Sequence, residues 1–521
     1  MVANPRLLLA EPDVATIHTL SLNELSTRAL SRRVEHVRDD PRIPLCVKLE
    51  GAVLRTGTTA ELAIALVRHR PWMLFPLLAW MFLGTGAFRE RVAERAALNP
   101  ASLPYRKPFL AFLQREVAKG RRVILVARAR PEVAEAIARH LGLISAIVEI
   151  DHDVADPGEG IAKKLCAQFG TGDFDYAGFG PSDIPVWRTA RRSVIVAPSP
   201  KLLKNRIWNS QTADIVCPDD RGTGRYVDAL RPGRWIKNLL IFLPLLNATY
   251  RNDPHFLVKA YLFFCVYCMI ASAGYVLNDM IDLVADRRHA TKRKRVLALG
   301  RLPIPHGFVL ALSLLASGFA LALFLSPRLA GWMAVYLALS LSYSLWLKKT
   351  LFIDTFALTA LYMHRVLTGA LLVWSAPSLW QMLFAGFFFF SLANLTRYGE
   401  LKGARLPGNK RATRARAYRR GDLDFLAGFG LASGYLSAFL LVIYAFEPEA
   451  RALFRSPVAL WNLWPILIYW VTRVWMQARR GNVPDDPVLF ALDDKASLLL
   501  GLGAVAVVLV ALFVKLPLFV L

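Results

Sequence analysis

The apolar residues follow two different patterns on either side of residue 220. Before it, short runs rich in β-branched residues (PLCVKL, RRVILVARA, SAIVEI, RSVIVA) alternate with helix-like segments such as PEVAEAIARHLGL. This alternation predicts a doubly wound, Rossmann-type α/β domain. After it, nine apolar segments of membrane length follow closely, at about 235–250, 257–278, 305–325, 329–347, 351–373, 379–396, 423–446, 458–476 and 497–516. We therefore expect a second, all-α domain of nine transmembrane helices.

A polar stretch from Gln211 to Arg225 separates the two parts. The predicted divisions are an N-terminal extension at 1–40, an α/β domain at 41–210, a linker at 211–225 and a membrane domain at 226–521. The α/β part contains one further apolar segment, Pro71–Gly86, which Pro76 interrupts. This segment is short for a membrane span, so we expect an interfacial or helical-hairpin segment that lies on the membrane domain.

The net charge of +25 requires an anionic partner, either a nucleic acid or the inner leaflet of a membrane. Because 55% of the residues are hydrophobic, the membrane is the expected partner and no nucleic acid is expected. Lysine and arginine gather in the loops after spans two, four, six and eight, which places those loops in the cytosol. The first twenty residues lack the charged start of a signal peptide, so we expect the α/β domain to remain cytosolic too. A multi-pass protein of a bacterial-type inner membrane is indicated.

A cluster of oxygen ligands ends the second predicted span. Asn278, Asp282 and Asp286 recur every four residues and share one helix face, with Asp279 beside them. Like charges so close together need a cation, and oxygen ligands alone suit Mg²⁺, which also binds phosphate oxygens of a substrate. These four residues are the predicted metal ligands. The alternative is a solvated acidic helix end.

A basic run follows at once. Lys292, Arg293 and Arg295 come directly after the acidic cluster, with Lys294 among them. Guanidinium and ammonium groups bind the oxygens of phosphates, so these residues are predicted to bind further anionic parts of the same substrate. Together the two clusters predict a diphosphate site at the cytosolic mouth of the membrane domain. The alternative is an ordinary positive-inside loop.

Four motifs in order carry a resemblance to a known family. They are RPGRWIKNLLIFLPLL, NDMIDLVADRRHATKRKR, YSLWLKK and RYGEL, spread over roughly 225–521. This part resembles the UbiA-type intramembrane prenyltransferase superfamily, and within it the polyprenyl-phosphate phosphoribosyltransferases. The resemblance implies nine transmembrane helices around a cavity open to lipid. It also implies transfer of ribose 5-phosphate from phosphoribosyl diphosphate to a polyprenyl phosphate, with release of diphosphate.

The place of the family's second aspartate-rich motif is basic in this chain. It holds Lys348, Lys349, Asp354 and Arg365, where aromatic prenyltransferases of the superfamily carry carboxylates. Basic residues bind phosphate directly, as a donor with a diphosphate and a 5-phosphate requires. Arg365 lies near the middle of a span, where a cation is costly and a functional role is expected. The alternative is a structural pair with a buried carboxylate, for which Asp354 is the candidate.

Further residues receive roles from their positions in these motifs. We expect Asp282 and Asp286, through the metal, to stabilise the departing diphosphate. Lys237, Tyr343 and Lys348 are expected to position phosphates. The remaining candidates close the site from the sixth span: Arg397, Tyr398 and Glu400. Relatives often carry a lysine where this chain has Thr396, so Lys402 is a candidate substitute. The alternative for each is a side chain that snorkels to the interface.

The α/β domain resembles a haloacid dehalogenase-type phosphatase with altered motifs. Lys48 replaces the aspartate nucleophile of the first motif, and Glu50 replaces its second aspartate. Ala127 stands at the strand end where a threonine or serine is expected, and Asp183 is the carboxylate that remains of the fourth motif. An ammonium cannot form an aspartyl phosphate, so we predict an inactive pseudo-phosphatase. The alternative is that the motifs are aligned wrongly.

The sequence therefore predicts a Mg²⁺-dependent membrane phosphoribosyltransferase with a lipid phosphate acceptor. Two further enzyme and non-enzyme hypotheses remain open: a prenyltransferase that joins an isoprenyl diphosphate to an aromatic acceptor, and a scaffold without catalysis. A transporter would also carry charges within spans, but it would not require an acidic helix end followed by a basic run.

Overall fold

The computed structural model describes residues 40–150, 156–199, 202, 213–216, 222–246, 250, 252–289, 291–373, 377–403, 418–482 and 486–516. The chain forms two compact units. Unit 1 comprises Met1–Thr59, Leu83–Ala93 and Tyr105–Asp220, and unit 2 comprises Ala60–Phe82, Glu94–Pro104 and Arg221–Leu521. The division after Asp220 falls within the predicted linker. Almost all of the predicted N-terminal extension and part of the linker lie outside the described residues.

Unit 1 is built on a six-stranded parallel sheet with the order β3-β2-β1-β4-β5-β6. The strands are β1 (Leu45–Lys48), β2 (Val123–Ala127), β3 (Ala146–Glu149), β4 (Asp175–Gly178), β5 (Arg192–Val196) and β6 (Ala213–Val216). The residues of β2 and β4 are all buried, and β2 is a continuous apolar run, as expected for a central parallel strand. The expected parallel α/β sheet is confirmed, and β1 and β4 are the neighbours at which the strand order reverses.

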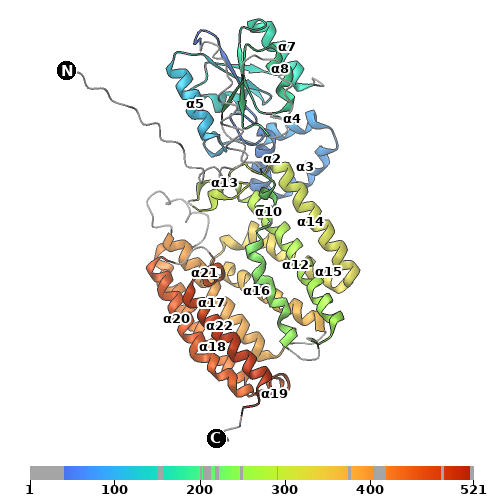
Figure 1. Cartoon of the computed structure of the whole chain (residues 1–521), viewed down its shortest axis with the longest axis vertical. Coiled ribbons are helices and arrows are strands. Elements are labelled where there is room, and N and C mark those ends of the chain that lie inside the picture. Colours follow the sequence, from blue (N-terminus) through green and yellow to red (C-terminus); the bar gives the residue numbers. More distant parts are fainter. Residues whose placement is uncertain are drawn as a thin grey trace, which may run out of the picture. The chain divides into compact units, whose positions relative to one another are not determined.

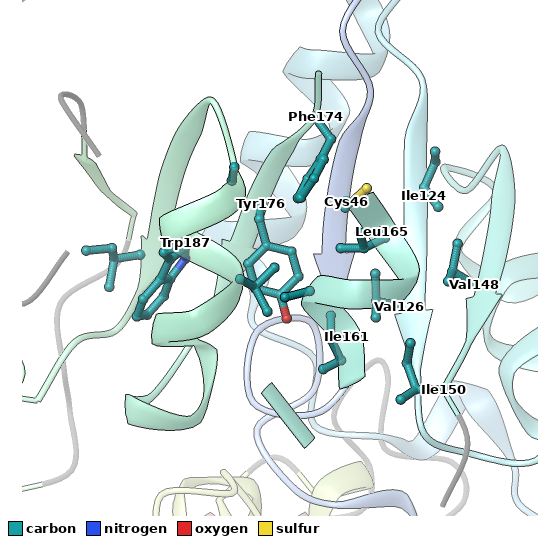
Figure 2. Packing of buried hydrophobic residues seen from close by; sticks show 14 of the residues in the cluster. Cys46, Ile124, Val126, Val148, Ile150, Ile161, Leu165, Phe174, Tyr176 and Trp187 are labelled. Atoms are coloured by element: carbon teal, nitrogen blue, oxygen red, sulfur yellow. The ribbon is translucent and has the colours of Figure 1, made fainter. Parts of the chain in front are cut away.

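Helices cover both faces of this sheet (Figure 1). They are α5 (Lys107–Ala118), α6 (Pro131–Leu141), α7 (Pro157–Phe169) and α8 (Ile184–Thr189), with the 3₁₀ turn η4 (Pro181–Asp183) before α8. Most of α4 (Thr85–Arg95) also belongs to unit 1. Figure 2 shows one core layer, in which Ile161 and Leu165 of α7 and Trp187 of α8 face Tyr176 and Cys46 on the strands. These side chains are buried, so their packing holds β1 and β4 in place. Lys48 lies at the end of β1, and Asp183 follows β4.

Unit 2 is helical. Its long helices are α12 (Pro254–Ile281), α14 (Ile304–Leu325), α15 (Pro327–Leu345), α16 (Ile353–Val373), α17 (Leu379–Gly403), α18 (Leu423–Tyr444), α20 (Leu463–Arg480) and α22 (Lys495–Phe513). Shorter elements are α10 (Gly224–Leu230), η5 (Pro232–Leu246), α13 (Leu283–Arg288), η6 (Lys292–Lys294), η7 (Leu347–Lys349), η9 (Arg420–Asp422), α19 (Pro448–Leu453), η10 (Pro457–Asn462) and α21 (Pro487–Asp493). Figure 1 shows α17, α18 and α20 side by side, and α12 packs against α14 and α15.

Seven helices within the described ranges are long and apolar enough to cross a membrane, so the chain is a multi-pass membrane protein. The count of nine is not confirmed. The predicted first span is the 3₁₀ element η5, which is 15 residues long and contains Pro244. The predicted eighth is shortened at its start by η10, and α20 carries Arg473, Arg479 and Arg480 among its 18 residues. An α-helical span needs about 20 predominantly apolar residues.

The segment between β1 and α5 groups largely with unit 2. It contains α2 (Thr58–His69), η2 (Pro71–Met73), α3 (Leu74–Met81) and η3 (Pro100–Ser102). Of its residues, Ala60–Phe82 and Glu94–Pro104 belong to unit 2, although the predicted bounds of the α/β domain, 41–210, included them. The apolar segment expected at Pro71–Gly86 forms η2 and α3, with Leu77 as the buried residue of α3.

Candidate active site

The predicted acidic cluster lies where α12 ends and α13 begins. The amide of Asp282 donates to the carbonyl of Asn278 at 2.9 Å, and the amide of Asp286 donates to the carbonyl of Asp282 at 2.8 Å. The i, i+4 spacing is therefore kept across the junction of the two helices, as predicted. This backbone pairing holds the side chains of the three residues on one side of the helical turn.

Asp279 is buried and contacts two arginines. Arg231 donates to both of its carboxylate oxygens, and Arg295 donates to Oδ1 at 3.0 Å. Arg231 stands between α10 and η5 with φ 54°, a conformation that residues other than glycine rarely adopt. The strained turn brings the guanidinium to the acidic cluster. Sequence reasoning did not single out Arg231, although it opens the RPGRWIKN motif.

Asp286 shares Arg295 with Asp279, through a contact of 2.5 Å from Nη1 to Oδ2. Burial raises the pKa of the Asp286 carboxyl to about 6, and the neighbouring Asp279 and Asp282 add to this rise against the opposing charge of Arg295. One guanidinium thus serves two carboxylates. With Arg231 and Lys348, it makes three cations for the three carboxylates of the cluster.

Asp282 is the most open carboxylate of the three, with 27% of its side chain exposed. Lys348 of η7 donates to both of its oxygens at 2.6 Å. The lysine comes from the segment in which the family's second acidic motif was expected. The ammonium therefore stands where a cation bound to Asp282 would stand.

A second group of charges surrounds Arg397 on α17. Its guanidinium contacts Asp354 at 2.5 Å and Glu400 at 2.8 Å, and it donates to the hydroxyl of Tyr343. Lys292 reaches Glu400 at 3.4 Å and so links this group to the basic run. The structure thus brings together most of the residues that the sequence assigned to substrate binding.

Two of the predicted binding residues lie elsewhere. Arg293 is exposed. Tyr398 is buried in the hydrophobic cluster of α17, α18 and α20, with its ring edge-on to Trp475 at 5.6 Å between centroids. Thr396 donates to the carbonyl of Leu392, and Lys402 donates to the carbonyl of Arg479. None of these contacts joins the acidic cluster.

Lys237 on η5 pairs with a residue that the sequence left without a role. Its ammonium contacts Asp486 at 2.6 Å and lies 5.3 Å from the ring centroid of Tyr362. Although burial opposes ionisation of Asp486, the charge of Lys237 holds its pKa below the usual value. The contact joins η5 to the start of α21. In the sequence, Asp486 stands out only as part of the acidic pair Asp485–Asp486.

Arg365 on α16 is buried among neutral partners. Its Nε donates to Asn238 Oδ1 at 2.9 Å, and its guanidinium lies 5.3 to 5.6 Å from the ring centroids of Tyr267, Tyr336 and Tyr362. No described carboxylate forms an ion pair with it. The alternative pairing with Asp354 is wrong, because Asp354 contacts Arg397 and accepts from the Tyr418 hydroxyl at 2.5 Å.

His364, next to Arg365, belongs to the same aromatic group. Its ring stacks on Trp332 with 4.4 Å between centroids, and its Nε2 bonds to the Trp332 carbonyl at 3.0 Å. Tyr267 bonds to the other ring nitrogen at 3.2 Å. Both nitrogens are used within the helix bundle, so His364 acts in packing.

The donor atoms fit Mg²⁺ as an ion shared with a substrate. Among the described residues, no three histidine, cysteine, aspartate or glutamate side chains come together as a protein cage. Mg²⁺ usually binds one or two carboxylates, several waters and substrate phosphates rather than such a cage. The exposed Asp282 with a cation on both oxygens, and Asp286 one helical turn away, match that pattern. Asp279 is already occupied by two arginines.

Comparison with known proteins gives three findings. Residues 239–486 match the UbiA prenyltransferase family. The uncharacterized protein y4nM of Sinorhizobium fredii is 32% identical over 464 residues, which is 89% of this chain and 90% of the relative. The decaprenyl-phosphate phosphoribosyltransferase of Mycobacterium tuberculosis is 34% identical over 186 residues, which is 35% of this chain and 62% of that enzyme, less than two thirds of its length.

Among solved structures, a UbiA homolog from Archaeoglobus fulgidus bound to GPP and Mg²⁺ aligns with 55% of this chain and 99% of its own. The sequence identity is 15% and the TM-score is 0.42. The alignment with y4nM, by contrast, is long enough to include residues of both units.

Proposed function

Because the chain belongs to the UbiA prenyltransferase family, we propose that it transfers 5-phosphoribose from phosphoribosyl diphosphate to a polyprenyl phosphate in a Mg²⁺-dependent reaction. The observation that carries this proposal is the contact of Lys348 with Asp282. A basic segment has replaced the second acidic motif, and it reaches the first acidic motif directly. The likeness to a decaprenyl-phosphate phosphoribosyltransferase supports the choice of donor and acceptor.

The residues of the acidic cluster divide the work on the diphosphate. Mg²⁺ held by Asp282 and Asp286, with the side chain of Asn278, would neutralise charge on the leaving diphosphate. Lys348 then exchanges a carboxylate for a phosphate oxygen as the substrate enters. Arg231 and Arg295 hold the side chain of Asp279, so that the helix end stays in place.

The reaction breaks the bond between C1 of the ribose and the diphosphate oxygen and forms a bond from C1 to an oxygen of the lipid phosphate. The nucleophile is already an anion, so no strong base is required. Arg397 and Lys292, with Tyr343, offer donors for the 5-phosphate. Lys237 and Arg365 lie farther along the bundle, on η5 and α16, and share the ring of Tyr362. We assign them to the acceptor phosphate.

The proposed setting is a bacterial-type inner membrane with the acidic cluster on the cytosolic side. Lysines and arginines in the even loops support this orientation. Cysteines introduced into the Gly403–Gly421 loop, most of which lies outside the described residues, should be labelled only from the cytosolic side. Labelling from outside intact cells would reverse the orientation.

Transfer is tested with the full chain in lipid nanodiscs. Phosphoribosyl diphosphate labelled in the ribose is incubated with polyprenyl phosphate, with and without Mg²⁺, and label is measured in the organic phase. We expect Mg²⁺-dependent label that the Asp282→Asn variant does not produce. Absence of label in the wild type contradicts the proposal. Consumption of an isoprenyl diphosphate with an aromatic acceptor instead would favour the alternative enzyme, and no reaction with either pair would favour the scaffold.

For unit 1 we propose a pseudo-phosphatase. Lys48, at the end of β1, contacts Asp183 at 2.5 Å and Ser182 at 3.2 Å. Glu50 accepts from both the amide and the hydroxyl of Thr58, so it is used to begin α2. The residues expected at a phosphatase centre are thereby engaged in structural contacts. The full chain should not hydrolyse phosphoryl donors, and release of phosphate at about 1 per second or more would contradict this assignment.

A further inference from the structure

The inserted segment between β1 and α5 is part of the packing of unit 2. Ala60 and Ile64 of α2 lie against a buried cluster formed by the end of α12, α13 and the start of α14. The buried residues of this cluster include Val276, Leu283, Val296, Leu297, Leu302 and Ile304. The same elements carry the acidic cluster and the basic run, so α2 touches the scaffold of the candidate site.

A buried ion pair accompanies this packing. Both oxygens of Glu61 accept from Arg287, at 2.7 and 2.9 Å. The side chains are 4% and 8% exposed. Arg287 also donates to the carbonyl of Ser102 at 3.1 Å and to that of Ala298 at 3.1 Å. One guanidinium therefore joins both ends of the insertion to α13 and to the loop beyond the basic run.

We propose that Glu61 is a positioning residue of the transferase, acting through Arg287 on the helix that carries Asp286. Arg287 follows Asp286 directly, and Ala298 follows Arg295, the residue that pairs with Asp286, by three positions. Holding both segments fixes the distance between Asp286 and Arg295. This inference rests on the proposed function, because an ordered α13 matters for transfer only if Asp286 binds the metal.

The physical argument is the cost of a buried charge. When one partner of a buried ion pair is removed, the other is left uncompensated and tends to move toward water. Loss of the Glu61 charge would therefore release Arg287, and with it α13, which is only six residues long. Residues that orient metal ligands from behind typically contribute tenfold to a hundredfold in metal affinity or activity.

The first test measures the order of α13 without any reaction. Amide hydrogen exchange of the full chain in nanodiscs is compared between wild type, Glu61→Gln and Glu94→Gln. Glu94 is the matched control, since it lies in the same insertion and pairs with Arg95 on the surface. We expect several-fold faster exchange over residues 283–299 in Glu61→Gln alone. Equal exchange in all three proteins would overturn the inference.

The second test separates positioning from plain stability. Binding of Mn²⁺, used as a spectroscopic substitute for Mg²⁺, is measured by electron paramagnetic resonance with diphosphate present. We expect about tenfold weaker binding in Glu61→Gln and in Arg287→Gln, with no further loss in the double variant. Wild-type binding that the variants retain contradicts the role of Glu61. A wild type that binds no Mn²⁺ contradicts the proposed function instead.

A separate observation concerns the exposed side of η2 and α3. Six large apolar side chains of this stretch are exposed: Trp72, Leu74, Phe75, Leu78, Met81 and Phe82. Phe75 is 75% and Phe82 is 91% exposed. Arg68 and Arg70 precede the stretch. α2, which precedes this stretch, packs with Ala60 and Ile64 at the end of the candidate span α12 and the start of the candidate span α14.

From this placement we infer that η2 and α3 lie on the lipid surface with their apolar side in the acyl region. Apolar and aromatic side chains on one side and nearby arginines suit an interfacial helix on an anionic leaflet. Nanodiscs that contain a phospholipid with a photoreactive acyl chain test this. Adducts are expected on residues 71–83 as well as on α14, and on neither β2 nor α7. Adducts on α14 without any on 71–83 would overturn the inference.

Discussion

Both units place a lysine against an aspartate, but the two carboxylates differ in what they can still bind. In unit 1, Asp183 is fully buried, and its oxygens accept from Lys48, the Tyr176 hydroxyl and the amides of Phe179 and Gly180. In unit 2, Asp282 is partly exposed and meets a single ammonium. A carboxylate whose acceptor sites are filled by the protein holds structure, whereas an open one can take a ligand.

The surroundings add to this difference. Among the described residues, Lys48 forms the ion pair with Asp183, whereas Asp282 has Asp279 and Asp286 within one helical turn. Burial and the neighbouring carboxylates raise the pKa of Asp286 to about 6 even though Arg295 contacts it. Lys348 is the cation that meets the partly exposed Asp282 and could be exchanged for a bound ion, so the same two residue types form a closed pair in unit 1 and an open pair in unit 2.

The largest expected effect breaks the site in unit 2. Asp282→Asn and Asp286→Asn should each lower phosphoribosyl transfer at least about a hundredfold, because a metal ligand contributes several kcal/mol to the transition state. The midpoint of thermal unfolding should stay near that of the wild type. Initial rates at saturating Mg²⁺ decide the matter. Turnover close to normal in either variant would remove the metal assignment.

A smaller effect is expected from the cation of the same pair. Lys348→Ala should lower transfer about tenfold to a hundredfold, since a hydrogen bond to a charged group contributes about 1.5–3 kcal/mol. Lys349→Ala is the control, because Lys349 is adjacent but exposed. Rates are measured over a range of phosphoribosyl diphosphate concentrations. Equal losses in both variants would show that general charge matters rather than the contact with Asp282.

The corresponding change in unit 1 should affect stability alone. Asp183→Asn weakens the contact with Lys48 in a buried setting and should lower the free energy of unfolding of unit 1 by about 2 kcal/mol. Transfer per folded molecule should be unchanged, as it should be for Lys48→Ala. Thermal unfolding and initial rates are measured on the same preparation. A loss of transfer in Lys48→Ala would make unit 1 a functional part of the site.

The smallest effect is expected at a partly exposed pair. Arg473 contacts Asp494 at 2.5 Å, with side chains 22% and 17% exposed. Because such ion pairs contribute little, Arg473→Ala should change the free energy of unfolding by less than about 1 kcal/mol and leave transfer unaffected. Measurement at low and high salt provides the check. A larger loss would mean that exposure is a poor guide to the difference between the two units.

Local sequence patterns were sufficient for the elements but not for the partners. Continuous apolar runs predicted the strands, and a spacing of four predicted the shared face of Asn278, Asp282 and Asp286. The pairing of Arg365 with Asp354 failed for a reason of length. Eleven residues on one helix place the two side chains on similar faces but about 16 Å apart along the axis. Asp354 instead meets Arg397 from another helix.

Long-range contacts account for the rest. Glu61 and Arg287 are 226 positions apart, and no local sequence pattern around either residue predicts their contact. The apolar content of Pro71–Gly86 indicated a segment on the membrane domain, but the contacts of Glu61, Ala60 and Ile64 with unit 2 could not be read from the sequence. The first span was predicted from apolar content alone. The segment instead forms the 3₁₀ element η5, which has 15 residues and contains Pro244.

The buried guanidinium of Arg365 bears on the order in which the helices insert into the bilayer. On an isolated helix, an arginine at mid-span costs about 2.5–3.5 kcal/mol on insertion scales. Three of its partners come from other elements: Asn238 of η5, Tyr267 of α12 and Tyr336 of α15. All three precede α16 in the chain, so during synthesis they are already present when α16 leaves the ribosome. The helix can therefore enter the membrane next to side chains that bind the Arg365 guanidinium as soon as it is inserted.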